Sequence, residues 1–193
     1  MRALIISGLL AITSPAWAQR PSIPVTAHPV LGLDVEGAAP FGDFGNSASF
    51  GFQFAFRAGV DLILGPGAYI APDGEINFVR FGAHGAAELG GLDSAIGVGF
   101  MLGGRFGYEF KNIATPFFDL HFGYYHAQAT GRACDLPASN CGSDKFGMEW
   151  GFGSTFWLSP SFGIGPLLKF NYDFTDNVTA NWFTFTADLV FRI

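Results

Sequence analysis

Charge and cysteine are both scarce in this sequence. Only 13% of the 193 residues are charged, which is about half the share found in an average soluble domain. The 10 Lys and Arg face 16 Asp and Glu and form no basic run, which argues against a nucleic-acid-binding protein. The two cysteines, Cys134 and Cys141, are too few for a four-cysteine zinc site or a disulfide-dense miniprotein.

Long hydrophobic runs are also missing. After residue 18, no apolar stretch approaches the roughly 20 residues that a transmembrane helix needs. Hydrophobic residues nevertheless make up 49% of the chain and aromatic residues 17%, a composition that excludes an intrinsically disordered protein. The 27 glycines recur throughout the chain and disfavour long helices. The composition therefore favours one β-rich domain with much apolar surface.

The first 18 residues have the features of a secretory signal peptide. Arg2 supplies the positive start, a short apolar stretch follows, and Ala16 and Ala18 are the small residues that signal peptidase requires. We expect cleavage before Gln19, because the stretch is too short to serve as a membrane anchor. Residues 19–29 contain three prolines and are expected to form a flexible lead-in on the periplasmic side.

Apolar residues alternate with small or polar residues along most of the remaining chain, the pattern of a β-strand between two different environments. The clearest case is residues 50–62, where every even position is apolar. Eight segments show the pattern: residues 30–39, 50–62, 69–79, 96–110, 116–126, 146–158, 162–174 and 182–193. Short and long connections alternate between them, as in an up-and-down meander.

The volume of the interior decides which face of these strands points inward. An eight-stranded barrel has an interior that is only just wide enough for side chains. The phenylalanine-rich faces are too bulky for it, whereas the faces of glycine with occasional long polar residues would fit. We therefore predict an all-β, eight-stranded antiparallel up-and-down transmembrane β-barrel over residues 30–193, apolar outside and polar inside. The soluble alternative, a lipocalin-like barrel, would need the opposite polarity.

This combination of export, strand count, alternation and loop asymmetry resembles the small eight-stranded outer-membrane barrels, the OmpA-like and OmpX-like family. The resemblance implies a monomer in the outer membrane with both termini in the periplasm and four extracellular loops. It implies contacts with outer-membrane lipid and lipopolysaccharide and with the outer-membrane assembly machinery. The last strand resembles the family's assembly signal, although the chain ends in Ile193 rather than Phe. The residues that correspond to this signal are Phe185, Leu189, Phe191 and Ile193.

The polar faces of the strands place eleven charged side chains in the predicted lumen. They are Arg57, Asp61, Glu75, Arg105, Glu109, Asp119, Glu149, Lys169, Asp173, Asp188 and Arg192. Because buried unpaired charge is costly, we expect them to form a network with Arg57 and Arg105 at its cationic centre. This network could be a salt-bridged plug or an ion path, and the narrow interior favours the plug.

The cysteines fall in the third long connection, between residues 132 and 144. Since the periplasm is oxidising, we expect a disulfide between Cys134 and Cys141. A reactive pair is the alternative, but the spacing is not that of a C-x-x-C redox motif.

Some barrels of this size are enzymes that modify lipid A with a histidine, a serine and an acid near the outer rim. The nearest arrangement here is His126 with Gln128, where a serine would be required. A second, looser one is His84 with Asp93 and Ser94. Neither set has all the required residues at a spacing that would bring their side chains into contact, so we expect no catalytic residues. No motif predicts a cofactor or a metal.

We therefore predict a non-enzymatic protein that contributes to membrane integrity, or to surface interaction and adhesion through its loops. The first alternative is a narrow channel for small or apolar solutes, as in OmpW-like barrels. The second is a lipid-A-modifying enzyme.

Overall fold

The computed structural model describes residues 24–85, 87, 90–135, 141–174 and 180–193. The predicted signal peptide, residues 1–18, and its cleavage site lie outside these residues. Among the described residues, no helix has the length and hydrophobicity that a membrane-spanning helix requires.

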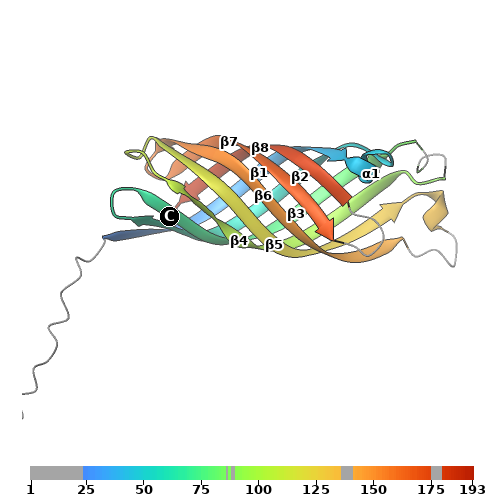
Figure 1. The fold of residues 1–193 in the computed structure, drawn as a ribbon, viewed down its shortest axis with the longest axis horizontal. Helices are drawn as coiled ribbons and strands as arrows, with labels where there is room; N and C mark the ends of the chain where they lie inside the picture. The colour runs from blue at the N-terminus through green and yellow to red at the C-terminus, as the bar shows by residue number, and fades with distance from the viewer. Residues whose placement is uncertain (1–23, 86, 88–89, 136–140, 175–179) are drawn as a thin grey trace, which may run out of the picture.

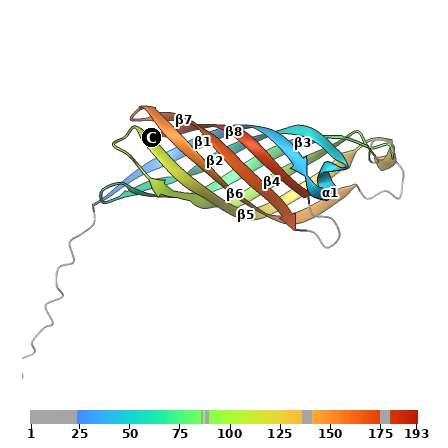
Figure 2. The ribbon, with the colours of Figure 1, turned by 45° about the horizontal axis from the view of Figure 1, so that its top comes forward.

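Eight tilted strands close into one barrel (Figures 1 and 2). Their bounds are β1 Val25–Phe41, β2 Ala48–Leu64, β3 Ala68–Ala83, β4 Ser94–Tyr108, β5 Ala114–Thr130, β6 Gly142–Ser159, β7 Phe162–Phe174 and β8 Ala180–Arg192. Each strand pairs antiparallel with the next, and β1 pairs with β8 from Val30↔Arg192 to Phe41↔Asn181. The predicted fold class is confirmed. Residues 25–29, which we expected in the lead-in, belong to β1.

The connections differ at the two ends of the barrel, as expected. Short turns join β2 to β3, β4 to β5 and β6 to β7 at one end, which we call the turn end. In the second of these turns Lys111 and Asn112 both have positive φ, 47° and 57°, which tightens the reversal. The longer connections meet at the opposite end, the loop end, and include helix α1 (Gly42–Gly45) and the 3-10 helix η1 (Arg132–Cys134). The described chain begins and ends at the turn end (Figure 1).

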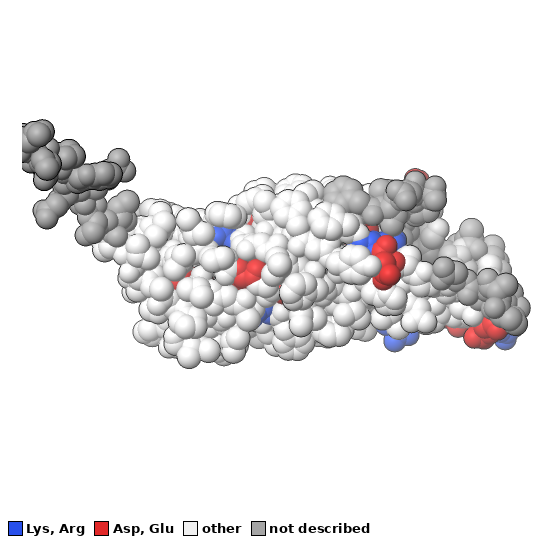
Figure 3. Space-filling view, turned by 90° about the horizontal axis from the view of Figure 1, so that it is seen from below, with Lys and Arg blue, Asp and Glu red and all other residues white. Residues whose placement is uncertain are grey.

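The exterior of the barrel is apolar. Phenylalanines such as Phe52, Phe100 and Phe152 have half or more of their surface exposed, on strands whose alternate residues are buried. Figure 3 shows a largely uncharged face, with most of the exposed charged side chains in view gathered towards the loop end. An apolar band around a closed sheet matches the lipid-facing surface of a transmembrane barrel.

The interior is more varied than the alternation predicts. Charged and polar residues fill the middle, but an apolar cluster lies at each end. The loop-end cluster contains Ala38, Ala48, Val79, Phe81, Met101, Tyr125, Ala180 and Trp182. The turn-end cluster contains Tyr69, Ala71, Phe117 and Leu167. Bulky aromatic side chains therefore fit inside near the mouths, where we expected only small or polar residues.

Candidate functional site

The structure places all eleven predicted lumen charges inside the barrel, each with at most 8% of its surface exposed. It brings them together as two separate clusters and one isolated acid. Four further lumen residues, which the list of charged candidates omitted, join them: Asp34, Glu36, Asp73 and His121. The alternation along β1, β3 and β5 could have identified all four, because each lies on the small or polar face of its strand.

The middle cluster has the pair Arg57 and Arg105 at its centre. Arg57 Nη2 lies 2.8 Å from Asp188 Oδ1, and Arg105 Nη1 lies 2.6 Å from Asp188 Oδ2. The Nε of Arg105 donates to Asp119 Oδ1 at 3.3 Å, and its guanidinium lies 4.3 Å from the centre of the Phe117 ring. One carboxylate thus bridges two cations, so neither arginine is buried without compensation.

Lys169 holds the acids on the other side of the same cluster. Its Nζ lies 3.1 Å from Asp34 Oδ2, 3.1 Å from Glu75 Oε1 and 3.2 Å from Glu36 Oε1. Glu149 Oε1 is slightly farther, at 3.5 Å. The other oxygen of Glu149 accepts hydrogen bonds from Asn77 and Tyr125. These residues come from five different strands and are brought together only by closure of the barrel.

A second charged cluster lies near the turn end. Arg192 Nε donates to Asp61 Oδ2 at 2.8 Å, and the same guanidinium pairs with Glu109. Tyr69 donates its hydroxyl hydrogen to Asp61 at 2.9 Å. Arg192 also lies over the Trp157 ring, 3.6 Å from its centre. Because these contacts need no member of the middle cluster, the predicted single network is in fact two.

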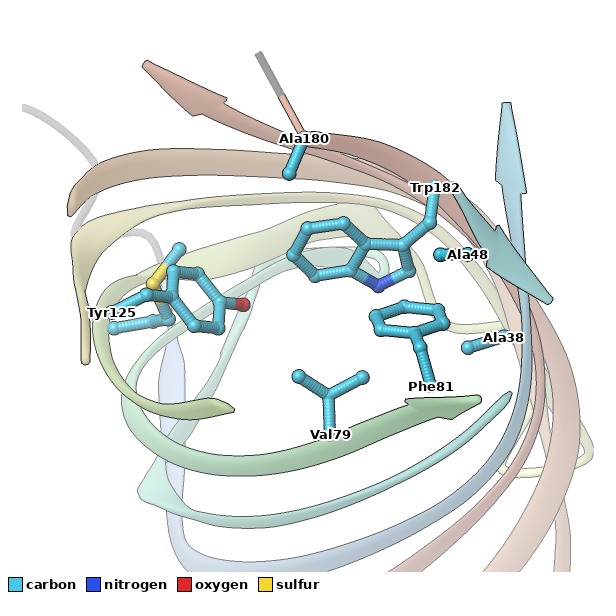
Figure 4. Packing of buried hydrophobic residues seen from close by; sticks show 8 residues of the cluster. Ala38, Ala48, Val79, Phe81, Tyr125, Ala180 and Trp182 are labelled. Atoms are coloured by element: carbon cyan, nitrogen blue, oxygen red, sulfur yellow. The ribbon is translucent and has the colours of Figure 1, made fainter. Parts of the chain in front are cut away.

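An aromatic layer covers the middle cluster at the loop end (Figure 4). Phe44 of α1 packs edge-on against Phe81, and Trp182 contacts both Phe81 and Tyr125 at ring-centre distances of 5.6 and 5.8 Å. The indole N–H of Trp182 donates to Gln53 at 3.1 Å. This hydrogen bond joins the layer to the lumen beneath, and the rings lie between the charged groups of the middle cluster and the loops.

Above this layer lies a cavity of about 180 Å³, which we call the mouth cavity. Its lining includes the aromatic residues Phe44, Phe81, Tyr125 and Trp182, together with Lys145 and Asp173. Asp173, the isolated acid among the eleven, thus belongs to the mouth. The cavity is smaller than the roughly 300 Å³ at which sites for drug-sized ligands begin. It suits one side group of a larger molecule.

The expected disulfide between Cys134 and Cys141 is present. Cys141 is also part of the mouth-cavity lining, and its carbonyl oxygen accepts a hydrogen bond from the amide of Ala129 at 2.8 Å. The bridge therefore ties the third long connection to the rim of the cavity.

His126 has an acidic partner that sequence reasoning missed. Its Nδ1 lies 2.7 Å from Asp144 Oδ1 on the outside of the barrel, and both side chains are about 60% exposed. On β6 the outward apolar residues begin at Phe146, so Asp144 lies beyond the apolar band. The hydrogen bond with His126 is the largest cause, and that with Tyr124 the second, of a pKa of Asp144 below its usual value.

This exposed pair has the histidine and acid of a catalytic triad but lacks a nucleophile in the expected place. Gln128 occupies that place, and an amide cannot act as the attacking group. The looser His84 arrangement is not assembled in the described residues either. The hydroxyl of Ser94 pairs with Thr130 at 2.8 Å, and the backbone of Asp93 bonds to Ala83 and Thr130.

The four residues that resemble an assembly signal all project outward from the end of the chain. Phe185, Phe191 and Ile193 are 62%, 45% and 75% exposed, and Leu189 is partly exposed. They form an apolar row that another molecule could contact.

Comparison with known proteins supports the fold. No family model matches the sequence, and no curated protein matches it. Neisserial surface protein A is 12% identical, with a TM-score of 0.57 over 87% of this chain and 99% of that chain. The outer-membrane enzyme PagL is 9% identical, with a TM-score of 0.58 over 84% and 99%. Ail, the attachment invasion locus protein of Yersinia pestis, is 16% identical, with a TM-score of 0.46 over 86% and 97%. Together with the closed eight-stranded sheet, the likenesses to Neisserial surface protein A and PagL show that the chain has the fold of the small eight-stranded outer-membrane β-barrels.

Proposed function

We propose that this protein is a monomeric, non-enzymatic barrel of the outer membrane that acts in surface interaction, or in membrane integrity, through its loop end. The termini and the short turns then face the periplasm, and the apolar band contacts lipid and lipopolysaccharide. The outward row that ends at Ile193 is the element offered to the assembly machinery.

The observation that carries this proposal is the packed lumen beneath an open mouth. Glu75, Glu149 and Lys169 have no exposed surface at all, whereas the lining of a water-filled path would be exposed. The aromatic layer further separates these charges from the loops. The mouth cavity and the disulfide-bridged connection remain available to an external partner, which could insert one side group between Lys145 and the aromatic floor.

The packed lumen argues against the first alternative, a narrow channel for solutes. Conduction would require the salt bridges of Arg57, Arg105 and Lys169 to separate, each in a medium where an unpaired charge is costly.

The second alternative, a lipid-A-modifying enzyme, is kept because PagL shares the fold and because His126 and Asp144 form an oriented pair. Gln128 argues against it. We expect lipid A mass spectra of cells that express the wild-type protein to match those of cells without it. Loss of an acyl chain in wild-type cells but not with His126→Asn would instead favour the enzyme.

Two measurements test the proposal. Purified protein in planar bilayers should give no conductance steps. Expressing cells should differ from non-expressing cells in retention on immobilised glycans and matrix proteins, or in survival in detergent.

The matched variants are Lys145→Ala at the mouth and Lys111→Ala in an exposed turn at the opposite end. The first should reduce retention and the second should not. Conductance steps, or identical behaviour of expressing and non-expressing cells in both assays, would contradict the proposal.

A further inference from the structure

Asp173 is a buried carboxylate without a compensating partner. It is 4% exposed, and its Oδ1 has no hydrogen-bond partner. Among the described residues no cation forms a salt bridge with it, whereas every acid of the two charged clusters has one. Burying an ionised group without a counter-charge is strongly unfavourable. A positive charge beside Asp173 would remove this cost.

Asp173 contributes to the lining of the mouth cavity, next to an aromatic ring. A Cβ on Gly147 would lie 3.0 Å from Asp173 Oδ1 and 3.0 Å from the ring of Tyr125, so the carboxylate and the ring lie side by side. The lining continues from these buried residues to Ser143, which is exposed. The volume of about 180 Å³ equals that of roughly six water molecules. A small group can therefore reach the acid from the loop end.

The aromatic rings of the lining stand nearly at right angles to one another. Phe81 and Tyr125 meet Trp182 at interplanar angles of 72° and 81°, and Figure 4 shows Trp182 between the other two. The hydroxyl of Tyr125 accepts a hydrogen bond from Asn77 at 2.9 Å. The indole N–H of Trp182 is bound to Gln53, so both rings are held in place. Fixed rings whose faces point in different directions are the arrangement that surrounds an organic cation in an aromatic cage.

An acid beside aromatic rings favours a quaternary ammonium group over other ligands. Asp173 would repel an anion, and a purely apolar group would leave its charge uncompensated. A primary ammonium group needs several hydrogen-bond acceptors, but the hydroxyl of Tyr125 is already bonded to Asn77 and Glu149. A quaternary ammonium group needs no acceptor, and both a carboxylate and ring faces attract it.

Lys145 is the second charged residue of the lining. Among the described lysines only Lys169 forms salt bridges, so Lys145 and Asp173 do not pair with each other. Lys145 is also partly exposed and thus lies nearer the outside than Asp173. Two opposite charges that line one cavity without pairing suit a zwitterionic ligand, with its cation at the acid and its anion at the lysine.

We propose that the mouth cavity binds a zwitterion in which a quaternary ammonium group is joined to an anionic group, as in phosphocholine. The ammonium group lies between Asp173 and the rings of Tyr125 and Trp182, and the anionic group lies at Lys145. This inference rests on the proposed function, because it names the side group that an external partner inserts into the same mouth.

The experiment measures the heat of binding to the purified wild-type barrel in octyl glucoside, a detergent without choline, at mildly alkaline pH. The probes are choline, phosphocholine and the uncharged isostere of choline in which carbon replaces the nitrogen. We expect one saturable site per barrel for choline and for phosphocholine, and binding of the isostere at least about tenfold weaker. Equal affinities for choline and its isostere would overturn the proposal, as would the lack of saturable binding of choline and phosphocholine at millimolar concentrations.

Matched variants test the two charged residues. Asp173→Asn should weaken the binding of choline at least about tenfold. Asp43→Asn, which removes an exposed acid of α1 outside the lining, should leave it unchanged. Lys145→Ala should weaken the binding of phosphocholine relative to that of choline, because only phosphocholine carries the anionic group. An unchanged affinity for choline in Asp173→Asn would refute the site. If that variant fails to fold, as judged by its mobility in unheated SDS gels, the comparison of choline with its isostere in the wild-type protein decides.

Vesicles distinguish a lipid headgroup from a soluble ligand. Equal affinity for added phosphocholine in phosphatidylglycerol and phosphatidylcholine vesicles would assign the site to a soluble ligand. A lower apparent affinity in phosphatidylcholine would show that the lipid headgroup competes for the cavity.

The outcomes also separate this inference from the proposed function. If choline does not bind but expressing cells still differ from non-expressing cells in retention, only the inference fails. If choline binds but expression changes neither retention nor survival, the proposed function fails and the binding site remains.

Discussion

At the scale of single residues, the lumen depends on arginines that each serve several acids. Arg105 pairs with Asp188 and Asp119 and also lies over Phe117, so it contributes both charge and packing. Arg80, on the outside of β3, is exposed. An arginine on the inward face of the sheet therefore contributes much more to the stability of the barrel than an arginine on the outward face.

Replacing Arg105 by Ala should lower the free energy of unfolding by about 3–5 kcal/mol, because Asp188 and Asp119 lose a buried counter-charge. Arg80→Ala is the control and should change it by about 0.5 kcal/mol or less, as for most exposed positions. Urea unfolding in detergent micelles measures both. An equal effect of the two substitutions would show that the arginine pair is not the centre of the plug.

The His126–Asp144 pair gives a second prediction, which concerns pH. Since the folded state holds the pKa of Asp144 below its ordinary value of 3.8, the pair contributes to stability above that pH. The contribution is lost as the pH falls through the lowered pKa. Carbon NMR titration of the Asp144 carboxyl should show the lowered value in wild type and a rise towards 3.8 in His126→Ala. An unchanged midpoint in the variant would exclude His126 as the cause.

At the scale of strands, glycine sets how closely neighbours can approach inside the barrel. A Cβ on Gly103 of β4 would collide with the backbone oxygen of Leu120 and with His121 of β5. A Cβ on Gly74 of β3 would instead meet the flexible end of Leu102 at 3.3 Å. The first neighbour is backbone and cannot move without disturbing the pairing of β4 with β5.

Gly103→Ala should therefore destabilise the barrel by about 1–3 kcal/mol, the usual cost of overpacking. Gly74→Ala should be neutral to within about 1 kcal/mol, because alanine also suits a strand slightly better than glycine. Parallel unfolding curves of the two variants test this. Equal stabilities would mean that β4 and β5 can separate without cost.

At the scale of the whole molecule, closure gives the barrel its resistance to unfolding. Pairing of β1 with β8 leaves no edge strand, so every strand has two hydrogen-bonded neighbours. In the membrane no water is present to replace these bonds, and opening any seam exposes unpaired backbone groups to lipid.

The protein in an outer-membrane fraction should therefore migrate differently in SDS gels before and after boiling, because the closed barrel resists SDS until it is heated. A protein recovered only from the soluble periplasm, with no difference in mobility, would contradict a membrane barrel. The lipocalin-like alternative would then be favoured.

The sequence by itself determined the barrel and the direction of its faces. Alternation is a local property of each strand, and the narrow interior of an eight-stranded barrel decides which face points inward. Together they assigned Arg57, Glu75 and Lys169 to the interior and the phenylalanines to the exterior. It assigned His121 and Asp34 to the interior as well, although their parity was not used to extend the network. Predicted export to the oxidising periplasm, with both cysteines in one connection, likewise sufficed to predict the disulfide between Cys134 and Cys141.

Only the tertiary structure decided which of these side chains meet. Arg57 and Asp188 are 131 residues apart, and Lys169 and Glu75 are 94 apart. Their contact depends on strand register and closure, which no local pattern encodes. The same holds for Asp144 beside His126, which lie on different strands. The aromatic layer escaped prediction because the barrel is wide enough for rings near its mouth and is filled by charged side chains at its middle.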